Sequence, residues 1–394
     1  MTVSVLAESS ETGGGVDERP QRMARVRAAM RERALRALVL VRPEDIYYLT
    51  GLNHQGHFAL SALVVSPVDA EPAVLVLRQM ERPTVEAQVR GCELLGYADD
   101  QDPGAAVVEA LRRVSDSGAI GIDRASMALP PSAWDALRAG VPSADWIDAG
   151  DLVPTMRAVK SAAEIEHVRR AAQISDRAIQ AGIAAAAPGV TEREIGAAVY
   201  RELIAAGSDH PGFVPLVRSG PTLPHEHVTW SERALLPGDT LFLELGAAVE
   251  RYHAPISRLV FIGRPPAGIE RSAAAVAGGM DAIRATLAPG VRAGEVYAAW
   301  QQAIDTALGH GRHRRHHCGY LVGIGFPPSW SGGGTPVGLR AGSSLEIRAG
   351  MTFHAISWVL GQDVPDFGIS DTALVTADGC ELLTTTRRDP IVVA

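Results

Sequence analysis

Near Val153 and Pro154, the distribution of apolar residues along the chain changes from one pattern to another. Before this point, short β-branched runs alternate with helical stretches, which is typical of an α/β domain. After it, two amphipathic segments come first, and strand-like runs dominate from Thr240 onward. The chain has 394 residues, which favours two or three domains. We therefore expect an α/β domain followed by a domain of α+β type.

In the first part, a helix is predicted from Asp17 to Leu35, because arginines there flank an apolar stripe. Four short runs are predicted strands: Ala37–Val41, Ala62–Val65, Ala73–Leu77 and Ala119–Asp123. The glycine run Gly13–Gly15, set among polar residues, predicts a flexible tail. The expected organisation is a disordered tail at 1–18, an α/β domain at 19–154 and an α+β domain at 155–394.

The second part opens with two helix-start signals. Ser161 with Glu164, and Thr191 with Glu194, each form the pattern of a capping box, in which two side chains satisfy free backbone N–H groups. The predicted strands that follow are Thr240–Leu245, Leu259–Gly263, Met351–Leu360 and Thr372–Val375. Two helix pairs packed against a curved antiparallel sheet are therefore expected.

Charge and composition exclude several classes of protein. A formal net charge of −8 argues against a nucleic-acid partner. No apolar run approaches the roughly 20 residues needed to cross a bilayer, so no membrane association is expected. The N-terminus lacks the basic start of a signal peptide, and three widely spaced cysteines imply no disulfide framework. We expect a cytoplasmic protein with a small-molecule substrate.

Several segments of the second part resemble the pita-bread family, which includes methionine aminopeptidase, aminopeptidase P, prolidase and creatinase. The segments are Met156–Ile165, Ser219-Gly220, His227 and Gly238-Asp239, in the family's order and spacing. The resemblance implies a pita-bread catalytic domain preceded by a creatinase-type α/β N-terminal domain. It also implies a homodimer in which the N-terminal domain of one subunit lies near the active site of the other.

The metal-binding members hold two divalent ions with two Asp, one His and two Glu. The corresponding positions of this chain are Glu244, Pro255, Tyr320, Ile356 and Ser370. A shift of one residue would replace Ser370 by Asp371 but would rescue none of the others. Because a pair of dications needs several anionic oxygens, we predict no metal ligands and no cofactor.

Three segments resemble ectoine hydrolase, a metal-free member related to creatinase. They are Arg251–Arg258, Gly319–Trp330 and Gly350–Trp358. The resemblance implies metal-independent hydrolysis of a C–N bond in a small cyclic amidine, amide or guanidino compound. The stretches Asn53–His57 and Gly309–His317 depart from that pattern and leave the substrate open.

Two residues are the predicted catalytic groups. His227 matches the family's catalytic histidine, a residue type that takes up and returns protons near neutral pH. Glu244 lies between Leu243 and Leu245 on an apolar strand, where a carboxylate is costly unless it is paired or protonated. It could orient water, attack the amidine carbon, hold a cationic substrate or make only a structural hydrogen bond.

Ten further residues are predicted to contact the substrate: His54, His57, His225, Tyr252, Arg258, Tyr320, Phe326, Trp330, His354 and Trp358. The aromatic residues suit cation–π contact with an amidinium, with core packing as the alternative. Arg258 has a structural ion pair as its alternative. On one strand, Tyr252 and Arg258 would share a face, and His253 would lie on the other.

Some chemistry-bearing residues have simpler interpretations. His310, His313, His316 and His317 have metal-like spacing, but three arginines among them would repel a cation, so a solvated basic turn is expected. Cys318 could be a nucleophile, although lone cysteines are more often small buried apolar residues.

Two other functions stay open. The same pocket could serve a cyclase, lyase or isomerase if water were excluded. The chain could also be a non-catalytic binding protein, although His227 and Glu244 count against that.

Overall fold

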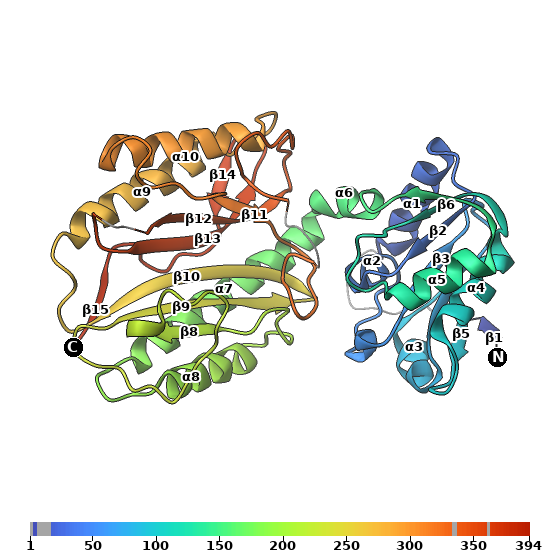
Figure 1. Cartoon of the computed structure of the whole chain (residues 1–394), viewed down its shortest axis with the longest axis horizontal. Coiled ribbons are helices and arrows are strands. Elements are labelled where there is room, and N and C mark those ends of the chain that lie inside the picture. Colours follow the sequence, from blue (N-terminus) through green and yellow to red (C-terminus); the bar gives the residue numbers. More distant parts are fainter. Residues whose placement is uncertain (1–2, 6–16, 333–336, 361–362) are drawn as a thin grey trace. The chain divides into compact units, whose positions relative to one another are not determined.

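The computed structural model describes residues 3–5, 17–332, 337–360 and 363–394, and it divides into two compact units (Figure 1). The first unit comprises Met1–Arg157 with Gly332–Thr335, and the second comprises Ala158–Ser331 with Pro336–Ala394. The division therefore falls three residues beyond the boundary expected at 154. Within the described residues, no helix is both long and apolar enough to cross a membrane.

The first unit contains a seven-stranded sheet in the order β1-β5-β4-β3-β2-β6-β7. Its strands are β1 (Val3–Val5), β2 (Ala37–Leu40), β3 (Ala62–Val65), β4 (Ala73–Arg78), β5 (Cys92–Tyr97), β6 (Ser117–Ile122) and β7 (Ser143–Asp148). Its helices are α1 (Arg19–Glu32), α2 (Pro43–Thr50), α3 (Arg82–Gln88), α4 (Pro103–Val114), α5 (Pro131–Gly140) and, crossing the boundary, α6 (Leu152–Ala158). The predicted helix and four predicted strands are all present.

The expectation of a disordered tail needs one correction. Residues 3–5 form β1, which pairs antiparallel with β5. The physical reason is that an edge strand offers unpaired backbone groups to any extended segment that reaches it. The rest of the predicted tail up to residue 16 lies outside the described residues.

The second unit contains a sheet in the order β11-β12-β13-β10-β9-β8, with β14 paired to β13 and β15 to β10. All of its strand pairs are antiparallel except that of β10 with β15, which is parallel. Its helices are α7 (Ala162–Ala185), α8 (Glu192–Ala205), α9 (Ile269–Thr286) and α10 (Ala293–Leu308). Its strands are β8 (Leu216–Ser219), β9 (Thr240–Val249), β10 (Tyr252–Ile262), β11 (Gly319–Leu321), β12 (Thr352–Val359), β13 (Phe367–Val375), β14 (Cys380–Leu382) and β15 (Ile391–Val393). Both predicted capping boxes are present at the starts of α7 and α8.

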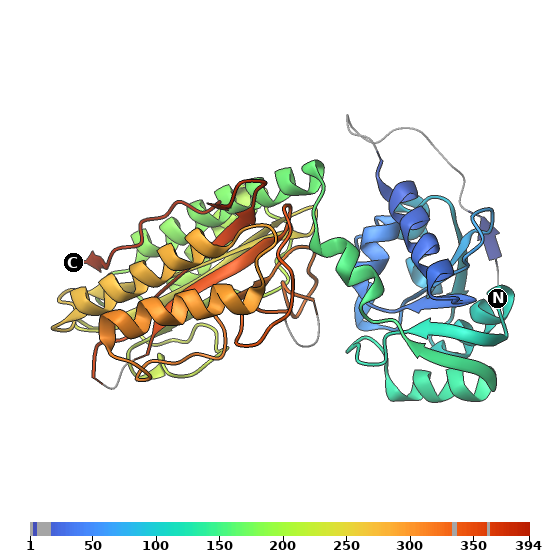
Figure 2. The same ribbon diagram turned by 90° about the horizontal axis from the view of Figure 1, so that it is seen from above.

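Both helix pairs cover the same face of this sheet. Helix α7 packs against β9 and β10, and α9 packs against β12 and β13, as Figures 1 and 2 show. The register places Leu243, Arg258, Ile369 and Ser357 in one row across β9, β10, β13 and β12. Ser357 belongs to the helix side, because its hydroxyl accepts a hydrogen bond from Trp300 of α10 at 3.1 Å. The opposite face, which we call the site face, carries the alternate residues of each strand.

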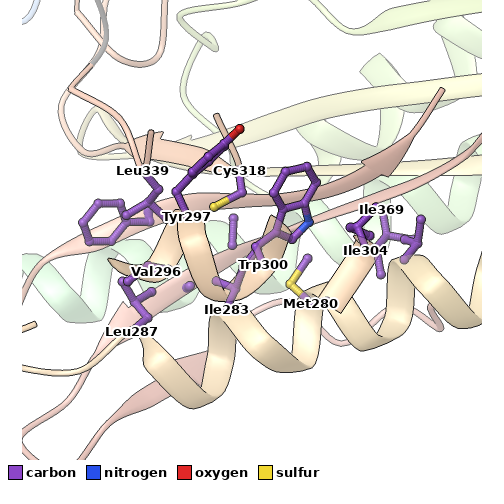
Figure 3. Close-up of a cluster of buried hydrophobic side chains, with 14 of the residues drawn as sticks. Met280, Ile283, Leu287, Val296, Tyr297, Trp300, Ile304, Cys318, Leu339 and Ile369 are labelled. Carbon is purple, nitrogen blue, oxygen red and sulfur yellow. The ribbon is translucent and has the colours of Figure 1, made fainter. Parts of the chain in front are cut away.

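Figure 3 shows the apolar core between α9, α10 and the sheet. Trp300, Met280 and Ile283 are buried there together with Cys318, which has no exposed surface. Burial raises the pKa of the Cys318 thiol well above its ordinary value. Cys318 is therefore a small apolar core residue, as the simpler interpretation predicted.

Candidate active site

Two rows of side chains cross the site face. One row contains Glu244, Ser257, Ser370 and Ile356, and the next contains Gly246, Pro255, Thr372, His354 and Tyr320. Together the rows hold every position at which the family resemblance places a metal ligand. The sheet register thus brings together residues that are far apart in sequence.

Glu244 is the carboxylate of these rows. Its side chain is 17% exposed, and its Oε1 atom lies 3.8 Å from Nε2 of His354. Burial raises the pKa of Glu244 to about 7, although the nearby Arg218 and Arg315 oppose the shift. Glu244 therefore populates both its protonated and its ionised form near neutral pH, as an acid–base group must.

A chain of hydrogen bonds runs beside Glu244. The indole of Trp330 donates to the Tyr320 hydroxyl at 3.0 Å, and that hydroxyl lies 3.0 Å from Nδ1 of His354. Nε2 of His354 lies 2.6 Å from the Ser370 hydroxyl, which donates to Ser257 at 2.7 Å. If neutral His354 carries its proton on Nε2, every donor in the chain points from Trp330 toward Ser257, an arrangement that strengthens each bond.

Burial fixes the protonation of this chain. It lowers the pKa of His354 to about 3, so the imidazole stays neutral at physiological pH. Burial also raises the pKa of the Tyr320 phenol above its ordinary value, and the Glu244 charge adds to that effect. Tyr320 is therefore a hydrogen-bond donor rather than a phenolate.

The donor set of the two rows does not suit a pair of divalent cations. It offers one carboxylate, hydroxyl groups and a histidine whose two nitrogens already have partners. Among the described residues, no group of three or more His, Cys, Asp and Glu side chains could hold a metal ion. In the predicted basic turn, His310 instead lies 3.0 Å from the carboxylate of Asp305.

Two stacked aromatic rings lie further along the site face. The rings of Phe242 and Trp358 are nearly parallel, with centroids 5.4 Å apart. Gly368 makes room for this stack, because a Cβ atom there would lie 2.7 Å from the indole of Trp358. A guanidinium group also lies over each ring. The guanidinium carbon of Arg218 lies 4.5 Å from the centroid of the Phe242 ring, and that of Arg315 lies 4.5 Å from the centroid of the Trp358 ring.

His227 is connected to Trp330 of the site face through two ring contacts. Its exposed ring contacts Phe213 with centroids 6.0 Å apart, and Phe213 contacts Trp330 at 4.9 Å. Its backbone has a φ of +57°, an uncommon conformation for a residue other than glycine. Among the described residues, no hydrogen bond or ion pair joins His227 to Glu244. The neighbouring His225 is exposed, and its carbonyl accepts a hydrogen bond from Arg218.

Tyr252 and Arg258 share the helix side of β10, and this shared face was predicted correctly. Tyr252 donates a hydrogen bond to Glu164 of α7, and Arg258 forms a buried ion pair with Asp371 at 2.9 Å. On the opposite side, His253 accepts a hydrogen bond from the backbone N–H of Gly212 at 2.7 Å. The geometry gives Tyr252 and Arg258 structural roles in place of the predicted substrate contacts.

The remaining predicted residues divide between the two units. Phe326 is buried beneath the guanidinium of Arg251, 4.6 Å from its ring, which is a packing role. His54 and His57 belong to the first unit, where Nδ1 of His57 lies 3.2 Å from the carbonyl of His54. Their contact with substrate stays a prediction.

Sequence reasoning did not identify Arg218, Arg315, Phe213 and Ser257 as residues of the site face. The sequence pattern could have identified Arg218, because an arginine within the strand Leu216–Ser219 is costly to bury without a polar partner. No sequence pattern could have identified the other three, because only strand pairing and ring contacts place them on the site face.

Comparisons with known proteins agree with this architecture. Residues 166–377 match the model of metallopeptidase family M24, and residues 22–159 match the creatinase/prolidase N-terminal domain. Ectoine hydrolase of Halomonas elongata is 29% identical over 392 residues, which cover 93% of this chain and 95% of that protein. The probable dipeptidase PepE of Mycobacterium tuberculosis is 28% identical over 377 residues, covering 95% of this chain and 96% of that protein. The solved prolidase of Pyrococcus horikoshii is similar with a TM-score of 0.81 at 22% identity, covering 94% of this chain and 100% of that one.

Proposed function

The chain belongs to metallopeptidase family M24, with a creatinase/prolidase N-terminal domain, and we propose that it is a hydrolase. In this proposal, it opens a C–N bond without a metal ion. The proposed substrate is a small cyclic amidine, or a related amide or guanidino compound. The observation that carries the proposal is Glu244. It is the one carboxylate at the five former ligand positions, and its pKa of about 7 suits acid–base work.

The site residues support a simple sequence of steps. Ionised Glu244 would attract the amidinium and take a proton from a water molecule, whose oxygen would then form a bond to the amidinium carbon. The protonated Glu244 would return that proton to the ring nitrogen as the C–N bond breaks. In the alternative course, the carboxylate forms a bond to the same carbon, and the ring C–N bond breaks as its nitrogen takes a proton from a water molecule. Water then hydrolyses the resulting imidate ester of Glu244 and releases the amide product.

The neighbouring groups have positioning roles in this proposal. The chain from Trp330 to Ser257 would hold its hydroxyl groups fixed beside the reacting carbon, so that little reorganisation is needed. Trp330 would face the delocalised cation, whereas the Trp358 ring already lies against Phe242 and Arg315. His227, at the outer end of Phe213, would exchange protons between the site and solvent.

The test is ring opening of ectoine by metal-stripped protein, followed by proton NMR with and without a chelator. We expect turnover that the chelator leaves unchanged and that Glu244→Gln abolishes. Turnover in H₂¹⁸O would place the label in the product, whereas a cyclase or lyase would incorporate none. A single-turnover experiment would place the first label on Glu244 if the carboxylate itself attacks.

Metal-dependent cleavage of dipeptides is the result that would contradict the proposal. Several relatives are named as dipeptidases or prolidases. If the protein left ectoine and related amidines intact but cleaved proline dipeptides once manganese or zinc was added, the metal-free proposal would be wrong.

A further inference from the structure

Arg315 is a half-buried cation whose side chain forms no close ion pair in the part of the chain that the structure describes. Its guanidinium lies 4.5 Å above the Trp358 ring, and no ion pair within 4.0 Å or hydrogen bond of its side chain joins it to any described residue. Its Nε atom and the indole nitrogen of Trp358 are both buried without a partner. Withdrawing a charge from water without pairing it is costly, so an anionic ligand would offset the cost.

The other charges near Arg315 define what kind of anion fits. Burial lowers the pKa of Arg315, and the carboxylates of Glu226 and Glu244 oppose that shift while Arg218 adds to it. Arg218 is already paired with Glu226 at 3.2 Å. Since Glu226 is paired with Arg218 and Glu244 is proposed to hold the cationic end of the substrate, Arg315 is the guanidinium near Glu244 that can pair with an anionic ligand. Its surroundings favour a monoanion, because a phosphate dianion would be repelled by both carboxylates.

We propose that Arg315 binds a carboxylate of the substrate, which makes the substrate a small zwitterion. Its cationic C–N group lies at Glu244, and its carboxylate lies at the guanidinium that Trp358 holds in place. Arginine suits this role because its planar fork offers two parallel N–H donors to a carboxylate. The inference rests on the proposed function for the cationic end of the substrate, whereas the anionic end is argued from Arg315 alone.

The experiment compares two ligands that differ only in the carboxylate. Ectoine carries a ring carboxylate, and 2-methyl-1,4,5,6-tetrahydropyrimidine is the same cyclic amidine without it. Dissociation constants are measured by calorimetry in the Glu244→Gln background, which prevents turnover and changes the cationic end equally for both ligands. Arg315→Gln tests whether Arg315 binds the carboxylate. Arg315→Lys keeps the positive charge but loses the two parallel N–H donors of the guanidinium. Arg314→Gln is the matched control, because Arg314 is an exposed neighbour.

We expect ectoine to bind at least ~10-fold more tightly than the analogue that lacks the carboxylate. Arg315→Gln should remove that preference while leaving the analogue's affinity within ~3-fold, Arg315→Lys should keep part of it, and Arg314→Gln should keep all of it. Equal affinity for the two ligands would overturn the inference, and so would a preference that survives Arg315→Gln.

A second ligand pair separates this inference from the proposed function. If no cyclic amidine binds or reacts, the same variants are compared with proline and pyrrolidine, which also differ by one carboxylate. A preference for proline that depends on Arg315 would support carboxylate binding by Arg315 while the amidine proposal fails. Ring opening of both amidines at equal kcat/KM would support the proposed function and would contradict carboxylate binding by Arg315.

Discussion

The surroundings of Glu244 determine the pKa of its carboxylate. Its strand neighbours across β10 and β13 are Ser257 and Ser370, which carry no charge. Without other carboxylates in its row, the pKa of Glu244 is governed by burial, which raises it to about 7. The sequence showed the carboxylate on an apolar strand, but only the pairing of the strands showed which groups surround it.

The pH dependence of activity follows from this pKa. We expect kcat/KM for amidine hydrolysis to fall as the pH drops below about 7, because Glu244 must be ionised to accept a proton. Glu244→Gln should lower kcat by ~10³-fold or more at pH 7 and above, since it removes the base. Steady-state rates between pH 5 and 9 measure both effects. An acidic limb with its midpoint below pH 5 would assign the base to another group.

The same burial predicts a change in stability. Because the pKa of Glu244 is raised from 4.5 to about 7 on folding, its contribution to stability is complete below pH 4.5 and is lost as the pH rises through 7. Glu244→Gln avoids this loss. The variant should therefore be more stable than the native protein by about 3 kcal/mol at pH 8.5 and no more stable at pH 4.5. Urea denaturation at the two pH values measures the difference, and equal gains at both would contradict the assigned cause.

At the scale of elements, the site depends on how β11 meets β12. Gly319 has a φ of +144°, and a Cβ atom there would lie 2.4 Å from the carbonyl oxygen of His354. This close approach pairs Tyr320 with His354 across the two strands. A residue with no side chain therefore holds the register on which the hydrogen-bond chain depends.

Gly319→Ala should lower the free energy of unfolding by about 2–4 kcal/mol, because the backbone must move or strain to admit the methyl group. It should also weaken turnover by separating Tyr320 from His354. Gly278→Ala is the matched control: Gly278 lies within α9, and a Cβ atom there meets nothing within 4 Å. That substitution should stabilise the protein by about 0.5–1 kcal/mol through helix propensity. Denaturant unfolding and the rate assay decide both outcomes, and a stable, fully active Gly319→Ala would refute the register argument.

At the scale of the whole molecule, the predicted homodimer can be tested through shared sites. If His54 and His57 of one subunit complete the site of its partner, two inactive variants should restore each other. We expect His54→Ala/His57→Ala mixed with Glu244→Gln to recover roughly a quarter of native activity. Half of the dimers would then be hybrids, each with one intact site, as twofold symmetry requires. Activity after co-refolding measures the recovery. No recovery from a confirmed hybrid dimer would mean that each subunit's site uses its own first domain or none.

Local signals predicted much of the fold. The two capping boxes and the longest apolar strands depend on neighbouring residues, and the structure contains them where the pattern placed them. Strands β5 and β7 were missed because Glu93, Gly96 and the polar residues of Ser143–Asp148 interrupt their apolar pattern. Strand β10 was recognised only at its end, because Pro255 and Arg258 are untypical of a central strand.

The sequence by itself determined which side chains stand where the family resemblance places metal ligands, because Pro255 and Ile356 have no ligand atom in their side chains. Tertiary structure decided what replaces the ligands. Ser257 and Ser370 are 113 residues apart, and only the pairing of β10 with β13 joins them. The stacking of Arg315 on Trp358 likewise depends on a loop meeting a distant strand. Residue identity is fixed locally by the chain, whereas hydrogen-bond partners and counter-charges are fixed by which segments the fold brings together.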